Sequence, residues 1–487
     1  MSISAVLTGK LHTLAKWGAA ALIVIALTWA AVIYWWRAAG RIVTAGDAAL
    51  FLVALPCLVL AGMAFLHARL RRRQAASPTA EGTSAAAGAN ATHNSQPALP
   101  ILNTWAVAGC AMTADELAEI LAQRSKRPQP DALLTNQDGF PVLTGRHDAL
   151  DTTRAECWLS QATDEPGATQ GWRDAFLRFL ALLELLTEQL ASDWEVLMDA
   201  HERQSTDGCG NEATLRGALS RPTSTASLQL HVNFLVPGAF QPQERRLATA
   251  YLGTLLRLPA GAGLASDPLP AQEDAYAIEL LDQFRRESQK DHRPQAMLLL
   301  AADSALCSTV LDAWQSDSRL YDVRCPNGLM AGEGAFAALC ANDAALAVLC
   351  AEPACLLAGA ALREREHSAD TARNRCHAAL DAAVSAVFED TAAPPCQIGS
   401  VVCDTDHRSG RVLECIGSMA HHAPHLDAIG DRLAVNETCG HLGAASALAV
   451  VSAGVQRVRD AAYPVLLLGV SHPTRRAAAL LLPVQHG

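Results

Sequence analysis

Three histidines near the end of the chain have a spacing that could bind a metal ion. His421, His422 and His425 follow an HHxxH pattern, and residues three or four positions apart share one face of a helix. Pro424 interrupts that helix, however, and no acidic ligand is obvious beside it. A solvated loop is therefore the favoured interpretation, and we expect no metal and no cofactor.

Carboxylates and glycines could supply two other kinds of site. Asp404 and Asp406 could bind a cation at the end of a predicted strand, but two carboxylates at such a position are more typical of a turn. Gly332 and Gly334 lie two residues apart, and no Lys-Ser/Thr pair follows them. This sequence is not that of a phosphate-binding loop, which needs the lysine and the hydroxyl for the phosphates and Mg²⁺.

Three further segments combine glycine, histidine and acidic residues with predicted strands and helices. Residues 274–280 (DAYAIEL) begin a helix that leads to an apolar strand at 297–302. Residues 326–335 (PNGLMAGEGA) form a turn that runs into an apolar strand. Residues 436–447 (NETCGHLGAASA) follow a strand with a glycine turn and a helix of small residues.

In this order, the three segments resemble the β-ketoacyl synthases of the thiolase-like superfamily. Gly-Glu-Gly-Ala at 332–335 and Gly-His-Leu-Gly-Ala-Ala-Ser at 440–446 match best. The resemblance covers residues 274–484 and, more loosely, the chain from residue 101. It implies an α/β fold, a thiolase-like αβαβα sandwich of two duplicated halves, placed here at 101–345 and 346–487.

The resemblance also implies where a nucleophile should lie. Condensing enzymes use a cysteine at a helix N-terminus, where the dipole and backbone amides stabilise the thiolate. That position falls on Ala271, and no cysteine lies between Cys209 and Cys307. Glu273 and Asp274 follow directly, and their negative charges would repel an anionic nucleophile. The nucleophile is missing.

The other catalytic groups of the family are only partly matched. His441 matches the second histidine, and the lysine five residues before it is Asn436. The first histidine should lie near Asp404, and His407 comes three residues too late to take its role. Condensation by the usual mechanism is therefore not expected, and a structural role for His441 is favoured over proton transfer. The vestigial candidates are Ala271, Asp404, Asn436 and His441.

The elements that must position these groups alternate between strand and helix, which predicts an α/β architecture with buried strands. Predicted strands are 101–108, 228–236, 297–302, 334–340, 398–403, 432–436, 464–470 and 477–483. Predicted helices are 172–190, 245–256, 274–286, 372–388 and 444–458. The short turn 471–476 predicts that the last two strands are antiparallel.

Residues 1–73 are predicted to be a membrane anchor with two transmembrane helices. Uninterrupted apolar runs at 17–36 and 48–67 are each long enough to cross a bilayer. A signal peptide is the less favoured alternative for the first run, because the run is too long and a second one follows. Basic residues precede the first run and follow the second at Arg69 and 71–73, so the positive-inside rule places both ends in the cytoplasm.

Residues 74–100 are rich in Ala, Ser, Thr, Gly and Pro, which predicts a flexible linker. Residues 1–73 hold eight of the 38 basic and one of the 49 acidic residues, a net charge of +7, so the remaining chain carries −18. That negative charge would repel phosphate backbones, and nucleic acid is an unfavourable partner. The 14 cysteines form no CxxC pair, which suits a reducing compartment.

The favoured function is a membrane-tethered, catalytically inactive synthase-like protein that acts as an adaptor or scaffold. Degenerate synthase-like proteins with N-terminal spans look like accessory components of bacterial type VI secretion systems, which places this protein at the bacterial inner membrane with its α/β part in the cytoplasm. Two alternatives stay open. One is an acyltransferase or acyl-thioester binder that uses His441 with another nucleophile, for which Ser266 is the nearest hydroxyl. The other is a partner subunit of an active condensing enzyme, and a homo- or heterodimer is expected.

Overall fold

The computed structural model describes residues 97–162, 173–207, 228–257, 269–271, 275–288, 290, 292–370, 377–391 and 394–484. Both predicted membrane spans, 17–36 and 48–67, and residues 74–96 of the predicted linker lie outside these residues. Within the described ranges, no helix is both long and apolar enough to cross a bilayer. The first strand begins at Leu99, inside the predicted linker.

The first half of the described chain runs from β1 to β7. Its elements are β1 (Leu99–Ala108), α4 (Ala114–Gln123), β2 (Gln129–Thr135), β3 (Pro141–Gly145), α5 (Thr153–Ala162), α6 (Arg173–Asp207), β4 (Gln229–Pro237), α7 (Pro242–Leu255), β5 (Leu269–Ala271), α8 (Tyr276–Ser288), β6 (Gln295–Ser304), α9 (Ser308–Ser316) and β7 (Ala331–Ala341).

Helix α10 (Asp343–Leu349) connects this half to the second. The second half consists of β8 (Cys355–Glu364), α11 (Ala378–Thr391), a 3₁₀ turn η2 (Pro395–Gln397), β9 (Ser400–Cys403), α12 (Ser409–His422), β10 (Arg432–Ala434), α13 (Val435–Cys439), a 3₁₀ turn η3 (Gly443–Ala445), α14 (Ser446–Ala461), β11 (Val465–Gly469) and β12 (Arg475–Leu482).

The two halves have the same strand topology. In the first, β4 is parallel to β5 and β6, whereas β7 is antiparallel to both β6 and β1. In the second, β9 is parallel to β10 and β11, whereas β12 is antiparallel to both β11 and β8. The chain visits equivalent positions in the same order, so the fold is duplicated. Strands β1 and β8 pair with each other and join the two sheets.

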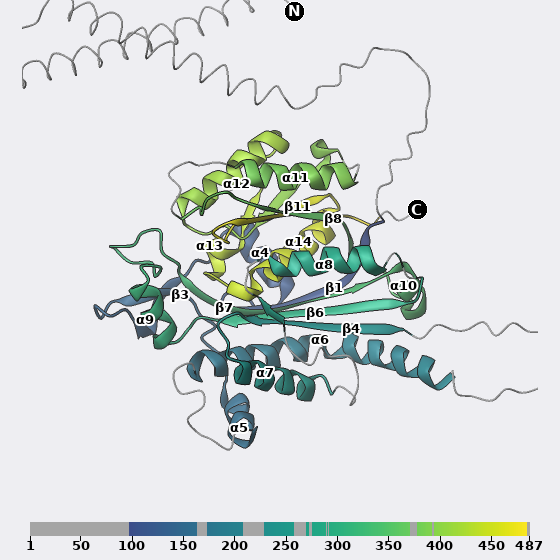
Figure 1. Cartoon of the computed structure of the whole chain (residues 1–487), viewed down its shortest axis with the longest axis horizontal. Coiled ribbons are helices and arrows are strands. Elements are labelled where there is room, and N and C mark those ends of the chain that lie inside the picture. The colour runs from purple at the N-terminus through teal and green to yellow at the C-terminus, as the bar shows by residue number, and fades with distance from the viewer. Residues whose placement is uncertain are drawn as a thin grey trace, which may run out of the picture. The chain divides into compact units, whose positions relative to one another are not determined.

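The elements stack in five layers (Figure 1). Helices α11 and α12 cover the outer face of the second-half sheet, and α6 and α7 cover the outer face of the first-half sheet. Helices α4, α8 and α14 lie between the two sheets, where they form a core with strands of both halves. This arrangement is the αβαβα sandwich that the motifs imply.

Small side chains allow a helix to be enclosed between two sheets. All eleven residues of β7, AGEGAFAALCA, are buried, and in α14 every residue from Ser446 to Gln456 is buried. A helix that is apolar all round is suited to such an enclosed layer. The alanine-rich composition therefore provides the small side chains that let the middle layer of helices pack between two sheets.

The structure confirms most of the predicted elements and corrects several. The last two strands, β11 and β12, are antiparallel as expected. The predicted strand 432–436 is wrong in its second part, because the chain turns into α13 at Val435. Helix α6 extends to Asp207, well past the predicted end at 190. Strands β2, β3, β5 and β8 and helices α4, α5, α9, α10 and α12 were not predicted.

Helix α6 buries an acidic side chain, Glu184, that is only 8% exposed. Burial raises the pKa of this carboxyl from its ordinary value to about 7, an effect that Glu188 and Asp151 reinforce and Arg154 opposes. A carboxyl whose pKa is raised in the folded state favours folding most below its unfolded pKa. That contribution is lost as the pH rises through about 7.

We predict that Glu184→Gln stabilises the protein increasingly as the pH rises from 5 to 8, because the amide carries no charge to bury. At pH 8 the gain in the free energy of unfolding should be about 2 kcal/mol. Urea unfolding at a series of pH values measures it. Glu195→Gln, at an exposed position of the same helix, is the matched control, and equal pH profiles for the two variants would contradict the prediction.

Candidate functional site

The glycine-histidine segment of the second half lies against the first half through its backbone. Helix α13 ends at Gly440, which has a φ of 76°. The next residue, His441, donates its backbone N–H to the Met330 carbonyl over 2.7 Å and forms a parallel bridge to Ala331. A Cβ on Gly440 would lie 2.6 Å from the Ala331 oxygen, so a side chain is excluded here by both φ and contact.

Two glycines of the first half make room for the same segment. A Cβ on Gly145 would lie 1.9 Å from the Cys439 carbonyl oxygen, and one on Gly332 would lie 2.4 Å from it. Strand β3 brings Gly145 beside Gly332 by parallel pairing with β7. The Gly-Glu-Gly-Ala and Gly-His motifs are therefore neighbours in space.

A carboxylate of the protein, that of Asp303, binds the turn η3 that leads into α14. Asp303, near the end of β6, accepts a hydrogen bond from the Ala444 amide over 2.9 Å. Gly443 has a φ of 48°, and a Cβ there would lie 2.1 Å from an Asp303 oxygen. Because a negative charge at a helix start interacts favourably with the dipole, Asp303 stabilises the turn that follows His441.

Glu333, the acidic residue of Gly-Glu-Gly-Ala, is fully buried and holds four parts of the first half together. Arg178 of α6 donates from Nε to its Oε2 over 2.8 Å, and Ser304 Oγ donates to the same oxygen over 2.9 Å. The backbone amide of His147 donates to Oε1 over 2.8 Å. A buried charge needs this set of partners, so Glu333 is a structural residue.

The four vestigial candidates are held by neighbouring segments. Ala271 ends β5 opposite Pro237 of β4, and both β4 and β6 contact η3 directly after His441. Asn436 and His441 belong to one turn, because the Asn436 carbonyl accepts from the Gly440 amide over 3.2 Å. Asp404 precedes Thr405, whose carbonyl accepts from the Glu437 amide over 3.1 Å.

The Asp404 carboxylate binds backbone amides of the protein. Its Oδ1 accepts hydrogen bonds from the backbone amides of Val470 and Ser471, over 2.6 and 3.1 Å. Asp406 instead pairs with the guanidinium of Arg408. Asp404 therefore connects the ends of strands β9 and β11.

His441 and Asn436 have different surroundings. The His441 ring meets the Trp314 ring edge-on, with centroids 5.8 Å apart. Asn436 is 2% exposed, and among the described residues neither its side-chain oxygen nor its nitrogen has a hydrogen-bond partner. Asn436 is therefore a buried polar group that the surrounding protein leaves unsatisfied.

The HHxxH histidines are split by the end of α12. His421 and His422 belong to the helix, whereas His425 lies beyond it and its Nε2 lies 2.8 Å from the Ile398 carbonyl oxygen. His422 approaches Asp381 of α11. Within the described ranges, no three His, Cys, Asp or Glu side chains are grouped so as to hold a metal ion.

A cysteine pair beside the glycine-histidine segment was not anticipated from the sequence. Cys110, just after β1, and Cys439, at the end of α13, have sulfurs 3.2 Å apart. They are 329 positions apart in the chain, so no local motif connects them.

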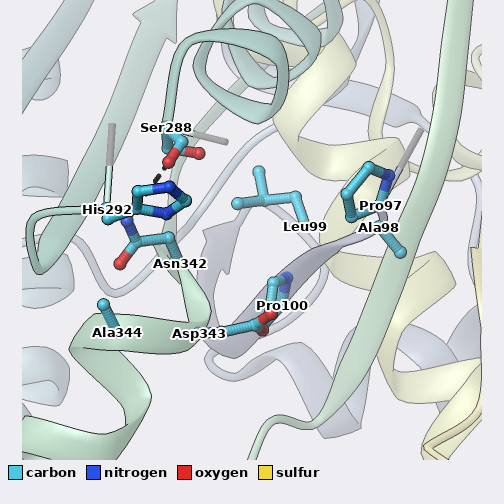
Figure 2. A pocket seen from close by; sticks show the side chains of 9 residues that line it. All are labelled: Pro97, Ala98, Leu99, Pro100, Ser288, His292, Asn342, Asp343 and Ala344. Carbon is cyan, nitrogen blue, oxygen red and sulfur yellow. Dashed lines mark hydrogen bonds between the residues drawn. The ribbon is translucent and has the colours of Figure 1, made fainter. Parts of the chain in front are cut away.

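A pocket of about 180 Å³ lies where the described chain begins. Figure 2 shows the segment Pro97–Pro100 on one side of it and Ser288, His292 and Asn342 on the other. The Asn342 side chain is committed to the protein, because it caps α10 at the Ala345 amide and also bonds backbone groups of Gln295, Arg293 and Ser288.

No protein-family model and no curated protein matches this chain, but many solved structures do. The ishigamide ketosynthase/chain length factor matches with a TM-score of 0.50 at 14% identity, over 80% of this chain and 100% of that one. A type II PKS acyl-carrier protein in complex with its ketosynthase matches with a TM-score of 0.53 at 11% identity, over 80% and 100%. A ketosynthase from module 6 of the bacillaene synthase of Bacillus subtilis 168 matches with a TM-score of 0.51 at 12% identity, over 80% and 72%.

The fold is that of the ketosynthases. At these identities the likeness concerns the backbone alone, and what the ketosynthase fold does in this chain depends on its own side chains.

We predict that Gly145→Ala destabilises the ketosynthase fold by about 1–3 kcal/mol, because its Cβ displaces the Cys439 carbonyl and strains the contact between the halves. Gly253→Ala is the matched control, since nothing lies within 4 Å of a Cβ at that helical position. It should stabilise the protein by about 0.5–1 kcal/mol. Urea unfolding of both full-length variants in one detergent measures the difference, and a Gly145→Ala variant as stable as Gly253→Ala would contradict it.

Proposed function

We propose that this chain is a membrane-tethered, catalytically inactive ketosynthase-like protein that acts as an adaptor or scaffold on the cytoplasmic face of the bacterial inner membrane. One observation carries the proposal: the nucleophile position falls on Ala271, at the end of β5. An acyl transfer that needs a thiolate at this place has no group to form it.

The state of the neighbouring groups supports inactivity. Asn436 carries an amide where the resemblance implies a lysine, and an amide cannot supply the positive charge of a lysine. Asp404 uses its carboxylate to hold the amides of Val470 and Ser471. Of the three positions at which the resemblance implies a lysine or a histidine beside the nucleophile, two hold a different residue, Asn436 and Asp404, and only His441 matches.

The partners that we propose are proteins. The similar structures include a ketosynthase with a chain length factor and a ketosynthase with an acyl-carrier protein, so the ketosynthase fold presents surfaces that other proteins bind. A tethered chain of this fold is suited to hold a partner at the membrane. We propose a secretion component or an effector, of the type VI kind, as that partner, and a homo- or heterodimer as the assembled form.

The alternative is an acyl-thioester-binding partner subunit of an active condensing enzyme. It is favoured by Asn436, whose buried amide lacks hydrogen-bond partners among the described residues. Such a group can bind a carbonyl or amide of a ligand without displacing an existing hydrogen bond. In that case Asn436 and His441 face a bound acyl chain.

We predict that tagged, detergent-solubilised protein, purified from its own cells, recovers secretion components or an effector. His441→Ala should recover the same set in the same amounts, because the proposal gives the imidazole no chemical role. Mass spectrometry of the eluates measures both. Recovery of an acyl carrier protein or a cysteine-bearing synthase, with loss in His441→Ala or Asn436→Leu, would replace the adaptor proposal by the alternative.

We also predict that residues 1–73 are sufficient to hold a fused fluorescent protein at the inner membrane, with its fluorescence retained in the cytoplasm. The basic residues at 69 and 71–73 set this orientation. Replacing all four by Ser and placing Lys residues in the loop 37–47 should increase the fraction of molecules with the opposite orientation. A periplasmic alkaline phosphatase fusion reports that orientation, and phosphatase activity of the unaltered anchor would contradict the prediction.

A further inference from the structure

Cys110 and Cys439 differ in how a reagent can reach them. The Cys110 residue is 9% exposed and lines a pocket of about 520 Å³, together with Lys126, Arg127 and Thr438. Cys439, next to Thr438, has no exposed surface. A small molecule in the pocket therefore contacts Cys110 and not Cys439, which does not line it.

The two sulfurs are already close enough to react with each other. They lie 3.2 Å apart, and a disulfide bond of about 2.0 Å needs them to approach by only about 1 Å. Their contact also connects the two halves, because Cys110 follows β1 of the first half and Cys439 ends α13 of the second.

The surroundings shift the pKa values of the two thiols in opposite directions. A hydrogen bond with Cys439 and the nearby charge of Lys126 lower the pKa of Cys110. Lys126 is held in place, since its Nζ donates to the Cys110 carbonyl over 2.7 Å. The hydrogen bond with Cys110 and burial raise the pKa of Cys439. Because Cys110 lines the pocket and Cys439 does not, both access and this difference in pKa favour Cys110 as the attacking thiolate and Cys439 as the thiol that follows.

We propose that Cys110 and Cys439 form a redox-active dithiol that a low-molecular-weight disulfide oxidises through the pocket beside Cys110. The Cys110 thiolate attacks one sulfur of the small disulfide, which forms a mixed disulfide and releases one small thiolate. Cys439 then loses its proton and attacks the Cys110 sulfur, which releases the second small thiolate. The protein gives up two electrons and two protons, and the small disulfide becomes two thiols.

The bond would act on the glycine-histidine segment. The Cys439 carbonyl is packed against Gly145 and Gly332, and His441 lies two residues further on. Drawing the Cys439 sulfur toward Cys110 moves this segment or locks it against the first half. In a reducing cytoplasm such a bond is transient and responds to the thiol pool, which gives the candidate site a reversible covalent control.

The test uses the full-length protein in detergent, reduced and then incubated with oxidised glutathione. Free thiols are alkylated, the chain is digested, and the peptides are assigned by mass spectrometry. The wild-type protein should yield the Cys110 and Cys439 peptides joined by a disulfide, and reduced glutathione should separate them. In Cys439→Ala, glutathione should accumulate on Cys110, whereas in Cys110→Ala the Cys439 thiol should stay unmodified.

Cys403 is the internal control. Its pKa is lowered to about 6, because a hydrogen bond with Cys415 and the charge of Arg432 outweigh the opposing effect of burial. It has no exposed surface, so it should stay unmodified if access through the pocket decides reactivity. Lys126→Met in the Cys439→Ala background should slow glutathione addition to Cys110 by about threefold, because the thiolate loses a stabilising charge.

Three results would overturn the proposal. The first is no joined peptide under conditions in which the exposed Cys157 and Cys396 take up glutathione. The second is glutathione on Cys439 in the Cys110→Ala variant. The third is reaction of Cys403 as fast as Cys110. The wild-type measurement needs no substitution, so a variant that fails to fold leaves the first result decisive.

Discussion

The two halves of the structure meet where backbone touches backbone. The Cys439 carbonyl lies against Gly145 and Gly332, and the His441 amide donates to the Met330 carbonyl. Because no Cβ fits between these segments, the contact fixes the path from α13 through η3. Helix α14 starts there, and every one of its residues from Ser446 to Gln456 is buried. An error at this contact would therefore misplace the helix on which both sheets pack.

Three carboxylates hold further segments of the two halves in place. Asp303 holds the start of η3, Glu333 joins α6 to the ends of β6 and β7, and Asp404 joins β9 to the end of β11. Glu333 and Asp404 are buried among backbone amides, a hydroxyl or a guanidinium, and removing one of their partners would leave a charge that cannot be solvated. The three carboxylates therefore already accept structural hydrogen bonds, and an acid–base role would have to break these bonds.

The sequence predicts the fold where apolar runs are bounded by clear breaks, and fails where they are not. Strands β6 and β11 are bounded by polar or proline residues and were found. Strand β8 lies in an alanine-rich stretch in which helix and strand have no distinct period, and it was missed. The motif around His441 pointed to the candidate site. The contact of Cys110 with Cys439 depends on how distant segments pack, and the spacing of the residues in the sequence carries no information about it.

The packing gives a physical reason for the residues of the two motifs. Gly440 is required by its φ of 76° and by the Ala331 carbonyl, and Gly332 is required by the Cys439 carbonyl. Glu333 is required because Arg178 and Ser304 converge on it. None of these requirements involves a substrate, so the contact between the halves by itself requires the glycines and the glutamate of these motifs. A match to these motifs accordingly indicates the fold, whereas activity has to be judged from the groups at Ala271, Asn436 and Asp404.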